Sequence, residues 1–172
     1  MWPNIRNYRR GVLWTWSATL ALIVAMAGGA EAALRIGTLL PSITLPGVAG
    51  APARIPDNLR GKVVLLHFWA VGCSSCRKEM SALDGLYGAY RRKGLEILAV
   101  NVGQRREIVK TSAAELKVSY PILLDADRKA AVLFDVAGLP CTYILDRNGV
   151  IRYKIIGDAA GENLKKLILS IL

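Results

Sequence analysis

The fold of this chain is decided by residues 63–102, VVLLHFWAVGCSSCRKEMSALDGLYGAYRRKGLEILAVNV. Residues 63–70 are a continuous apolar run, which predicts a strand covered on both faces. Residues 74–93 change to a helical period, with an apolar stripe of Cys76, Met80, Leu83, Tyr87 and Tyr90. Residues 95–102 predict a second buried strand. A strand, a helix and a strand in this order predict a right-handed parallel crossover.

The flanking segments complete the predicted fold class, a mixed α/β sheet with helices on both faces. Residues 33–61 hold four prolines and several glycines, so only short strands and turns are expected, with 42–45 the best strand candidate. The elements expected after the central unit are a helix at 104–117, a strand at 120–124, a helix at 127–136, strands at 142–145 and 150–156, and a helix at 161–172. In the turn between the last two strands, Asn148-Gly149 is expected to supply positive φ angles.

The first 32 residues differ from the rest in composition. Residues 1–10 carry three arginines and no acid, an apolar run begins at 12, and Ala30-Glu31-Ala32 follows. This is the layout of a secretory signal peptide that is cut after Ala32. Residues 12–30 are also long enough for a membrane anchor. We therefore expect a signal peptide or N-terminal anchor at 1–32. The exported domain, 33–172, is expected in the periplasm or on the extracytoplasmic face of the inner membrane.

Composition excludes several classes of protein. The 172 residues are 53% hydrophobic and 21% charged, which is too apolar for a disordered chain. Three cysteines are too few for a disulfide-stapled miniprotein, and one histidine is too few for a His-rich metal site. Lys and Arg exceed Asp and Glu by 23 to 13. This excess is scattered along the chain without interleaved aromatic residues, so we expect a solvated basic surface and no nucleic-acid partner.

The sequence C-S-S-C at the junction of the first strand and the helix carries the chemistry. A C-x-x-C at such a turn places Cys73 at the helix N-terminus, where free N–H groups and the helix dipole stabilise a thiolate. Cys76 lies one helical turn further in, close enough to form a disulfide. We expect the Cys73 thiolate to attack a substrate disulfide and Cys76 to resolve the mixed disulfide. A structural disulfide is an alternative, as is half of a zinc site completed by Cys141 and His67.

Residues 37–172 resemble the TlpA/ResA-like branch of the thioredoxin superfamily, which includes exported thiol-disulfide oxidoreductases and cytochrome c maturation proteins. The shared motifs are L-R-G-K-V-V-L at 59–65, F-W-A at 68–70, C-x-x-C-R-K-E-M at 73–80, G-L-E at 94–96, G-L-P-x-T at 138–142 and D-R-N-G at 146–149. The resemblance implies a thioredoxin-like fold and a protein-disulfide reductase. Because the two sulfurs carry the redox state, neither an organic cofactor nor a metal is expected.

The resemblance also implies roles for four further residues. Pro140 matches the cis-proline that faces the two cysteines, and the backbone of Leu139 would pair with a client strand. Glu79 matches an acidic residue three positions after the second cysteine, where a carboxylate would move the proton of the resolving thiol or recognise a partner. Trp69 would shield the site from water. The alternatives are a trans proline, a surface glutamate and a core tryptophan.

Departures from the family pattern leave some details open. Gly72 replaces a tryptophan and Ser74-Ser75 a proline-containing pair, so the reduction potential does not follow from the resemblance. His67 stands where thioredoxins have a buried aspartate, and it is either a proton relay to the resolving thiol or a hydrogen-bonded core residue. Cys141 stands where the family has threonine. It is either a small buried side chain or a third thiol beside the active site.

Three functions fit these features. The expected one is reduction of disulfides in exported client proteins, with electrons from a membrane thiol donor. Apocytochrome c is one candidate client, beside a copper-site assembly protein or a general pool. The alternatives are the same chemistry run as a thiol oxidase or isomerase, and copper(I) handling by Cys73, Cys76 and Cys141. A peroxidase is not expected, because the P-x-x-x-T-x-x-C pattern of peroxiredoxins is missing around Cys73.

Overall fold

The computed structural model describes residues 34–157 and 161–172. The segment expected to be a signal peptide or anchor, 1–32, lies outside the described residues. Within the described part of the chain, no helix is both long enough and apolar enough to cross a membrane.

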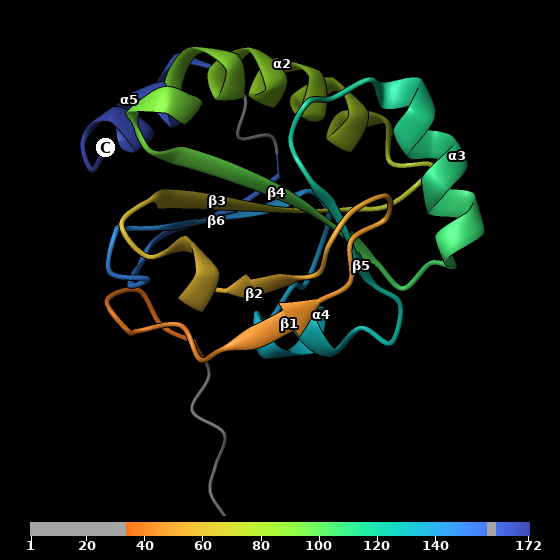
Figure 1. Cartoon of the computed structure of the whole chain (residues 1–172), viewed down its shortest axis with the longest axis horizontal. Coiled ribbons are helices and arrows are strands. Elements are labelled where there is room, and N and C mark those ends of the chain that lie inside the picture. The colour runs from red at the N-terminus through yellow and green to blue at the C-terminus, as the bar shows by residue number, and fades with distance from the viewer. Residues whose placement is uncertain (1–33, 158–160) are drawn as a thin grey trace, which may run out of the picture. The chain divides into compact units, whose positions relative to one another are not determined.

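A five-stranded mixed sheet forms the centre of the described region (Figure 1). Its strands, in the spatial order β5-β4-β3-β6-β7, are β3 (Val63–Trp69), β4 (Leu95–Val102), β5 (Ile122–Asp125), β6 (Cys141–Leu145) and β7 (Ile151–Ile156). The central strand β3 leads into α2 (Ser74–Tyr90), pairs in parallel with β4 and pairs antiparallel with β6. The predicted mixed sheet and parallel pairing are therefore confirmed.

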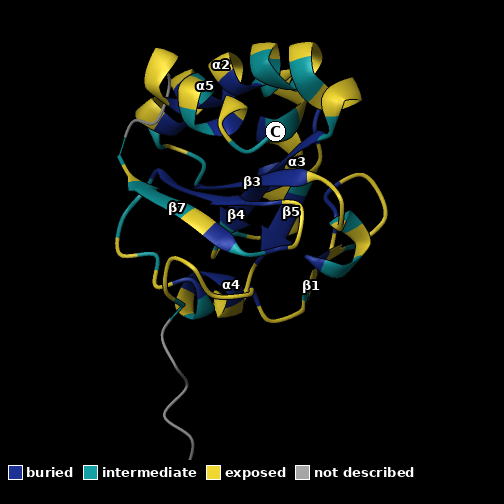
Figure 2. Cartoon of the chain, turned by 90° about the vertical axis from the view of Figure 1, so that its left-hand side faces the viewer, coloured by how far each residue is buried: buried dark blue, intermediate teal, exposed yellow. Residues whose placement is uncertain are grey.

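Helices cover both faces of the sheet, as predicted. One face carries α2, α3 (Arg106–Leu116) and α5 (Glu162–Leu169). The other is covered by α4 (Lys129–Leu133) and by a small hairpin of β1 (Ile43–Leu45) and β2 (Ala53–Ile55). Two short 3-10 helices complete the elements: η3 (Asp57–Leu59) and η4 (Arg91–Lys93). Figure 2 shows buried strands between helices whose outer surfaces are exposed.

Every residue of β3 is buried, which explains its continuous apolar sequence. Alternate side chains of a strand point to opposite faces. Leu65 and Trp69 therefore pack under α2, whereas Leu66 and Phe68 pack on the α4 side. Burying one side chain of this size contributes about 1.5–3 kcal/mol. The strand is fixed on both faces, and its carboxyl end is a rigid support for the loop that follows.

Several elements after α3 are shorter than predicted, α5 among them, and the structure gives a reason for α4 and β5. The helix expected at 127–136 is reduced to α4, because Arg128 (φ 62°) and Asp135 (φ 47°) adopt left-handed conformations on either side of it. The Asp125 carboxylate at the end of β5 accepts the N–H groups of Ala130 and Ala131 and so holds the start of this short helix. β5 itself begins two residues later than predicted, after a proline that has no N–H for the strand ladder.

The turn between β6 and β7 is a hairpin, as predicted, but its backbone differs from the expectation. Gly149 has φ 81°, whereas Asn148 is not in the left-handed region. The Asp146 carboxylate accepts the N–H groups of Asn148 and Val150 at 2.9 and 3.0 Å. These two bonds support the turn where a second left-handed residue was expected.

Candidate active site

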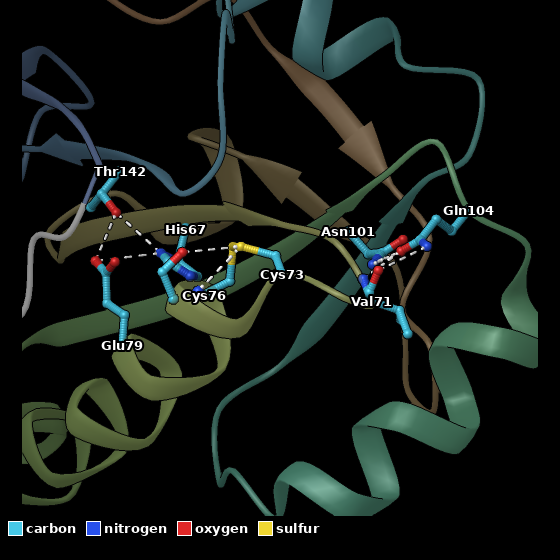
Figure 3. Close-up of a disulfide and its surroundings, with 9 residues drawn as sticks. His67, Val71, Cys73, Cys76, Glu79, Asn101, Gln104 and Thr142 are labelled. Carbon is cyan, nitrogen blue, oxygen red and sulfur yellow. Dashed lines mark hydrogen bonds and ion pairs between the residues drawn. A yellow bond between two sulfur atoms is a disulfide. The ribbon is translucent and has the colours of Figure 1, made fainter.

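Cys73 and Cys76 form a disulfide at the point where β3 passes into α2 (Figure 3). Cys73 is the N-cap residue of α2, and its Sγ accepts the N–H of Cys76 at 3.2 Å. The Ser75 hydroxyl lies 3.4 Å from the same sulfur. Cys73 is half-buried, whereas Cys76 is completely buried. Of this pair, Cys73 is therefore the sulfur that an approaching thiolate or disulfide can reach.

Pro140 lies close to the C-x-x-C loop, at the end of the sheet where β3 finishes and β6 begins. Because β3 and β6 are antiparallel and Phe68 is opposite Cys141, the end of β3 lies beside the residue that precedes β6. The Leu139–Pro140 peptide bond is cis, as the resemblance implies. Leu139 is half-buried and packs against the hydrophobic cluster that contains Cys76. The fold thus brings the C-x-x-C turn and the cis-proline loop together.

Glu79 is buried, 1% exposed, and lies among the buried residues of α2 with Cys76. Its Oε1 accepts a hydrogen bond from the Thr142 hydroxyl at 3.4 Å and lies 3.7 Å from His67 Nδ1. His67 and Thr142 are a cross-strand pair of β3 and β6, and His67 Nδ1 is 3.1 Å from Thr142 Oγ1. The carboxylate belongs to a buried polar group, so the alternative of a surface glutamate is wrong.

Burial sets the charge of His67. The side chain is fully buried, and this burial lowers the pKa of His67 to about 4. The imidazole is consequently neutral at pH 7. Trp69, at the end of the same strand, is also fully buried and packs in the same cluster as Cys76. In this oxidised form Trp69 exposes none of its surface to solvent.

Cys141 lies on the other face of the sheet from the disulfide. It packs in the cluster that contains Phe68, whereas Cys76 packs in the cluster under α2. Burial raises the pKa of the Cys141 thiol. In residues 34–157 and 161–172, no group of three or more His, Cys, Asp or Glu side chains is arranged to hold a metal ion. The interpretation of Cys141 as a third thiol of the active site is therefore wrong, and the copper(I) alternative loses its third ligand.

Two residues of the site do not follow from the motifs. Gln104 Oε1 accepts the N–H of Val71 at 2.7 Å, and Gln104 Nε2 donates to the Val71 carbonyl at 3.5 Å. The buried Asn101 donates to the same Oε1 at 2.9 Å. This amide bridge ties the end of β4 to the loop that leads into Cys73. The only sequence signal is positional: Asn101 is a polar residue near the carboxyl end of a buried strand that is parallel to β3, and Gln104 lies in the loop directly after that strand.

Proteins that exchange disulfides through two cysteines at the start of a helix are thioredoxin-like thiol-disulfide oxidoreductases, and this chain has both their fold and their disulfide. The chain belongs to the AhpC/TSA family, which matches residues 36–154.

Individual relatives agree with this class. The chain is 33% identical over 141 residues to the thiol-disulfide oxidoreductase ResA of Geobacillus kaustophilus, which covers 82% of this chain and 80% of the relative. It is 30% identical over 158 residues to ResA of Bacillus subtilis, covering 91% of this chain and 87% of the relative. A crystal structure from Chlorobium tepidum, described as a thiol:disulfide interchange protein DsbE, has a TM-score of 0.75 at 27% identity over 80% of this chain and 98% of that one. The protein is therefore a thiol-disulfide oxidoreductase.

Removing the Gln104 amide should destabilise the loop before Cys73. In Gln104→Ala the half-buried Val71 N–H loses its acceptor, which costs about 1–3 kcal/mol of unfolding free energy. Gln104→Glu is the matched control, because a carboxylate still accepts from Val71 and Asn101 and loses only the bond to the Val71 carbonyl. Urea denaturation of the oxidised protein should rank the alanine variant below the glutamate variant. Equal stability of the wild type and Gln104→Ala would show that the bridge contributes nothing.

His67 should make the stability depend on pH. Its pKa is about 4 in the folded protein against 6.5 for an unperturbed histidine, so below pH 6.5 the unfolded chain binds more protons. The difference between these two pKa values contributes to the unfolding free energy. This contribution is fully present above pH 6.5 and falls by about 3 kcal/mol as the pH drops to 4. Unfolding free energies of the wild type and His67→Asn, measured from pH 7.5 to 4, should therefore converge toward acid pH. Parallel curves would contradict this linkage.

Proposed function

We propose that this protein reduces disulfides of exported client proteins, with Cys73 as the nucleophile and Cys76 as the resolving cysteine. The unequal accessibility of the two sulfurs carries the proposal. In the reduced protein the Cys73 thiolate attacks the client disulfide, forms a mixed disulfide and releases the first client thiolate. Cys76 then loses its proton and attacks Cys73 Sγ. This releases the second client thiolate and regenerates the internal disulfide.

Clients bind, in this proposal, along the cis-proline loop. Leu139 and Pro140 stand beside the end of β3, close to the loop that carries Cys73. The backbone of Leu139 would pair with an extended client segment by β-augmentation, which depends on main-chain groups more than on client side chains. Recognition of this kind supports a reductase that accepts disulfides in different sequence contexts.

Glu79 is the proposed proton acceptor for the resolving step. It is buried together with Cys76, where bulk water does not reach the thiol. A positioned carboxylate in such a site accelerates proton transfer by about 10²–10⁴-fold. Trp69, buried in the cluster that contains Cys76, would exclude water from that sulfur.

The two sulfurs store the electrons, so the reaction needs no organic cofactor. After each turnover the internal disulfide must be reduced again, and we propose a membrane thiol protein as the electron donor. The domain would work in the periplasm or at the extracytoplasmic face of the inner membrane, with residues 1–32 as its signal peptide or anchor. Apocytochrome c is a candidate client because of the resemblance to TlpA/ResA-like proteins; a copper-site assembly protein or a general pool fits the same chemistry.

Single cysteine substitutions test the chemistry. Cys73→Ser should abolish reduction of insulin disulfides, because the buried Cys76 cannot replace it. Cys76→Ser should accumulate mixed disulfides, visible as covalent adducts on non-reducing gels. Cys141→Ser is the matched control and should retain wild-type reduction, since this thiol lies on the opposite face of the sheet. Full activity of Cys73→Ser would contradict the mechanism.

Export is tested on the protein recovered from cells. A signal peptide predicts a chain that begins at Ala33 in the periplasmic fraction. An anchor predicts an uncleaved chain in the membrane fraction, with its carboxyl-terminal domain open to protease added from outside. Recovery of the uncleaved chain in the cytoplasmic fraction would contradict both.

A further inference from the structure

Three buried polar side chains from three elements meet on the α2 face of the sheet. His67 from β3 and Thr142 from β6 are 0% exposed, and Glu79 from α2 is 1% exposed. Their polar atoms form a continuous series: His67 Nδ1 is 3.1 Å from Thr142 Oγ1, which donates to Glu79 Oε1 at 3.4 Å. Figure 3 shows the imidazole between the Glu79 carboxylate and Cys76.

The Thr142 hydroxyl fixes the positions of the protons in this series. A hydroxyl has one proton, and here it is donated to the Glu79 carboxylate. Nδ1 of His67 must then carry the ring proton, so that it can donate to Thr142 Oγ1. Because burial keeps the ring neutral, with a pKa of about 4, Nε2 has no proton. Nε2 of His67 is therefore a hydrogen-bond acceptor.

Nε2 of His67 is buried, and it has no hydrogen-bond partner among the described residues. Buried polar atoms in proteins are nearly always paired, so an unpaired acceptor requires an explanation. The sulfur of Cys76 is bonded to Cys73 in this oxidised structure and has no proton to donate. Reduction of the disulfide gives Cys76 an S–H group, which is a donor. The acceptor would thus gain its partner in the reduced protein.

We propose that His67 and Thr142 relay the proton of the Cys76 thiol to Glu79 during resolution of the mixed disulfide. This proposal rests on the proposed function and explains how its resolving step loses a proton inside the protein. His67 takes up the proton, and Thr142 is a positioning residue that connects the imidazole with the carboxylate.

The relay balances in protons and charge. The S–H bond of Cys76 breaks and an Nε2–H bond forms on His67, while His67 Nδ1 gives its proton to Thr142 Oγ1. Thr142 in turn gives its original proton to Glu79 Oε1. The result is a Cys76 thiolate, a neutral His67 of the other tautomer and a protonated Glu79, and the thiolate attacks Cys73 Sγ. When a donor later reduces the internal disulfide, Cys76 leaves as a thiolate and the same steps return the proton in reverse.

The titratable groups near the relay come from three places. Cys76, Glu79 and Asp84 come from α2, and Tyr120 comes from the segment before β5. Cys141 of β6 lies on the opposite face of the sheet, and burial raises the pKa of its thiol, so it stays protonated. Burial raises the pKa of Tyr120, so its hydroxyl stays protonated at neutral pH. The other elements on this face contribute apolar side chains: Ala99 of β4, Ile155 of β7, and Leu164 and Ile168 of α5. Within the described part of the chain, Glu79 is thus the base in which the relay ends.

The pH dependence of the resolving step tests the relay. The full-length reduced protein is mixed with a fluorogenic peptide disulfide, and release of the second peptide thiol is followed by stopped flow from pH 5.5 to 8.5. In the wild type the resolving rate should change less than threefold between pH 6 and 8. Thr142→Val keeps the shape of the side chain but removes the hydroxyl. We expect its resolving rate to fall at least tenfold at pH 6 and to rise about tenfold per pH unit, because only solvent then deprotonates Cys76.

Conservative variants distinguish the loss of the proton relay from the loss of side-chain packing. Thr142→Ser restores the hydroxyl and should restore the flat pH profile. His67→Asn keeps a donor in the place of Nδ1 but has no atom in the place of Nε2, so it should show the steep profile even if Thr142→Val does not fold. A flat profile in a folded Thr142→Val or His67→Asn protein would overturn the relay.

The first step of the reaction distinguishes failure of the relay from failure of the proposed function. Formation of the mixed disulfide is measured in a Cys76→Ser background, and the Thr142→Val change should alter its rate less than twofold. If Cys73 of this background forms no mixed disulfide, the proposed function fails and the relay fails with it. If the mixed disulfide forms normally and the resolving profiles are unchanged, only the relay is overturned.

Discussion

The structure depends on one constraint: Cys73 must cap α2, while Cys76, one turn later, must lie on the buried face of the same helix. The Cys73 sulfur accepts the N–H of Cys76, so the hydrogen bond that begins the helix also holds the reactive atom. The strand β3 leads into the loop that carries Cys73. It is buried along its whole length, so a shift of its register would expose apolar side chains. On the other side of the loop, Gln104 holds the backbone of Val71 in place. The accessible sulfur is thus positioned by elements that have little freedom to move.

The two faces of the sheet hold different parts of the core: the polar groups beside Cys76 lie on the α2 face, and Cys141 lies on the other. Pro140 lies close to the C-x-x-C loop because β3 and β6 are antiparallel neighbours. The carboxyl end of β3, which leads into the loop, therefore lies beside the amino end of β6, which follows Pro140. Alternation along β6 then places Thr142 under α2, with Glu79 and His67, and places Cys141 on the opposite face. The polar groups that serve the resolving cysteine are therefore gathered on one face, and the remaining thiol is kept away from the disulfide.

Most of the fold could be predicted because its patterns are local. The apolar runs of β3 and β4 and the apolar stripe of α2 each identify an element without reference to the rest of the chain. The ends of α4 could not be predicted, since they depend on left-handed residues and on the distant support of the Asp125 carboxylate. In the site, the two motif cysteines and the cis-proline were predictable from their sequence context. The Gln104 bridge and the contacts that join Glu79 to Thr142 and His67 depend on how distant strands and loops meet in space, which the motifs do not specify.

This thioredoxin-like oxidoreductase works, in our proposal, as a reductant. Its direction is set by the free-energy difference between the dithiol and the disulfide, and this difference depends on the residues around the two sulfurs, here Gly72, Ser74 and Ser75. The most direct measurement is the reduction potential of the Cys73–Cys76 pair in the full chain, obtained by equilibration with dithiothreitol or glutathione buffers and thiol alkylation. For a reductant we expect a value near that of thioredoxin, about −270 mV. A value near −120 mV would identify a thiol oxidase and contradict the proposed direction of the reaction.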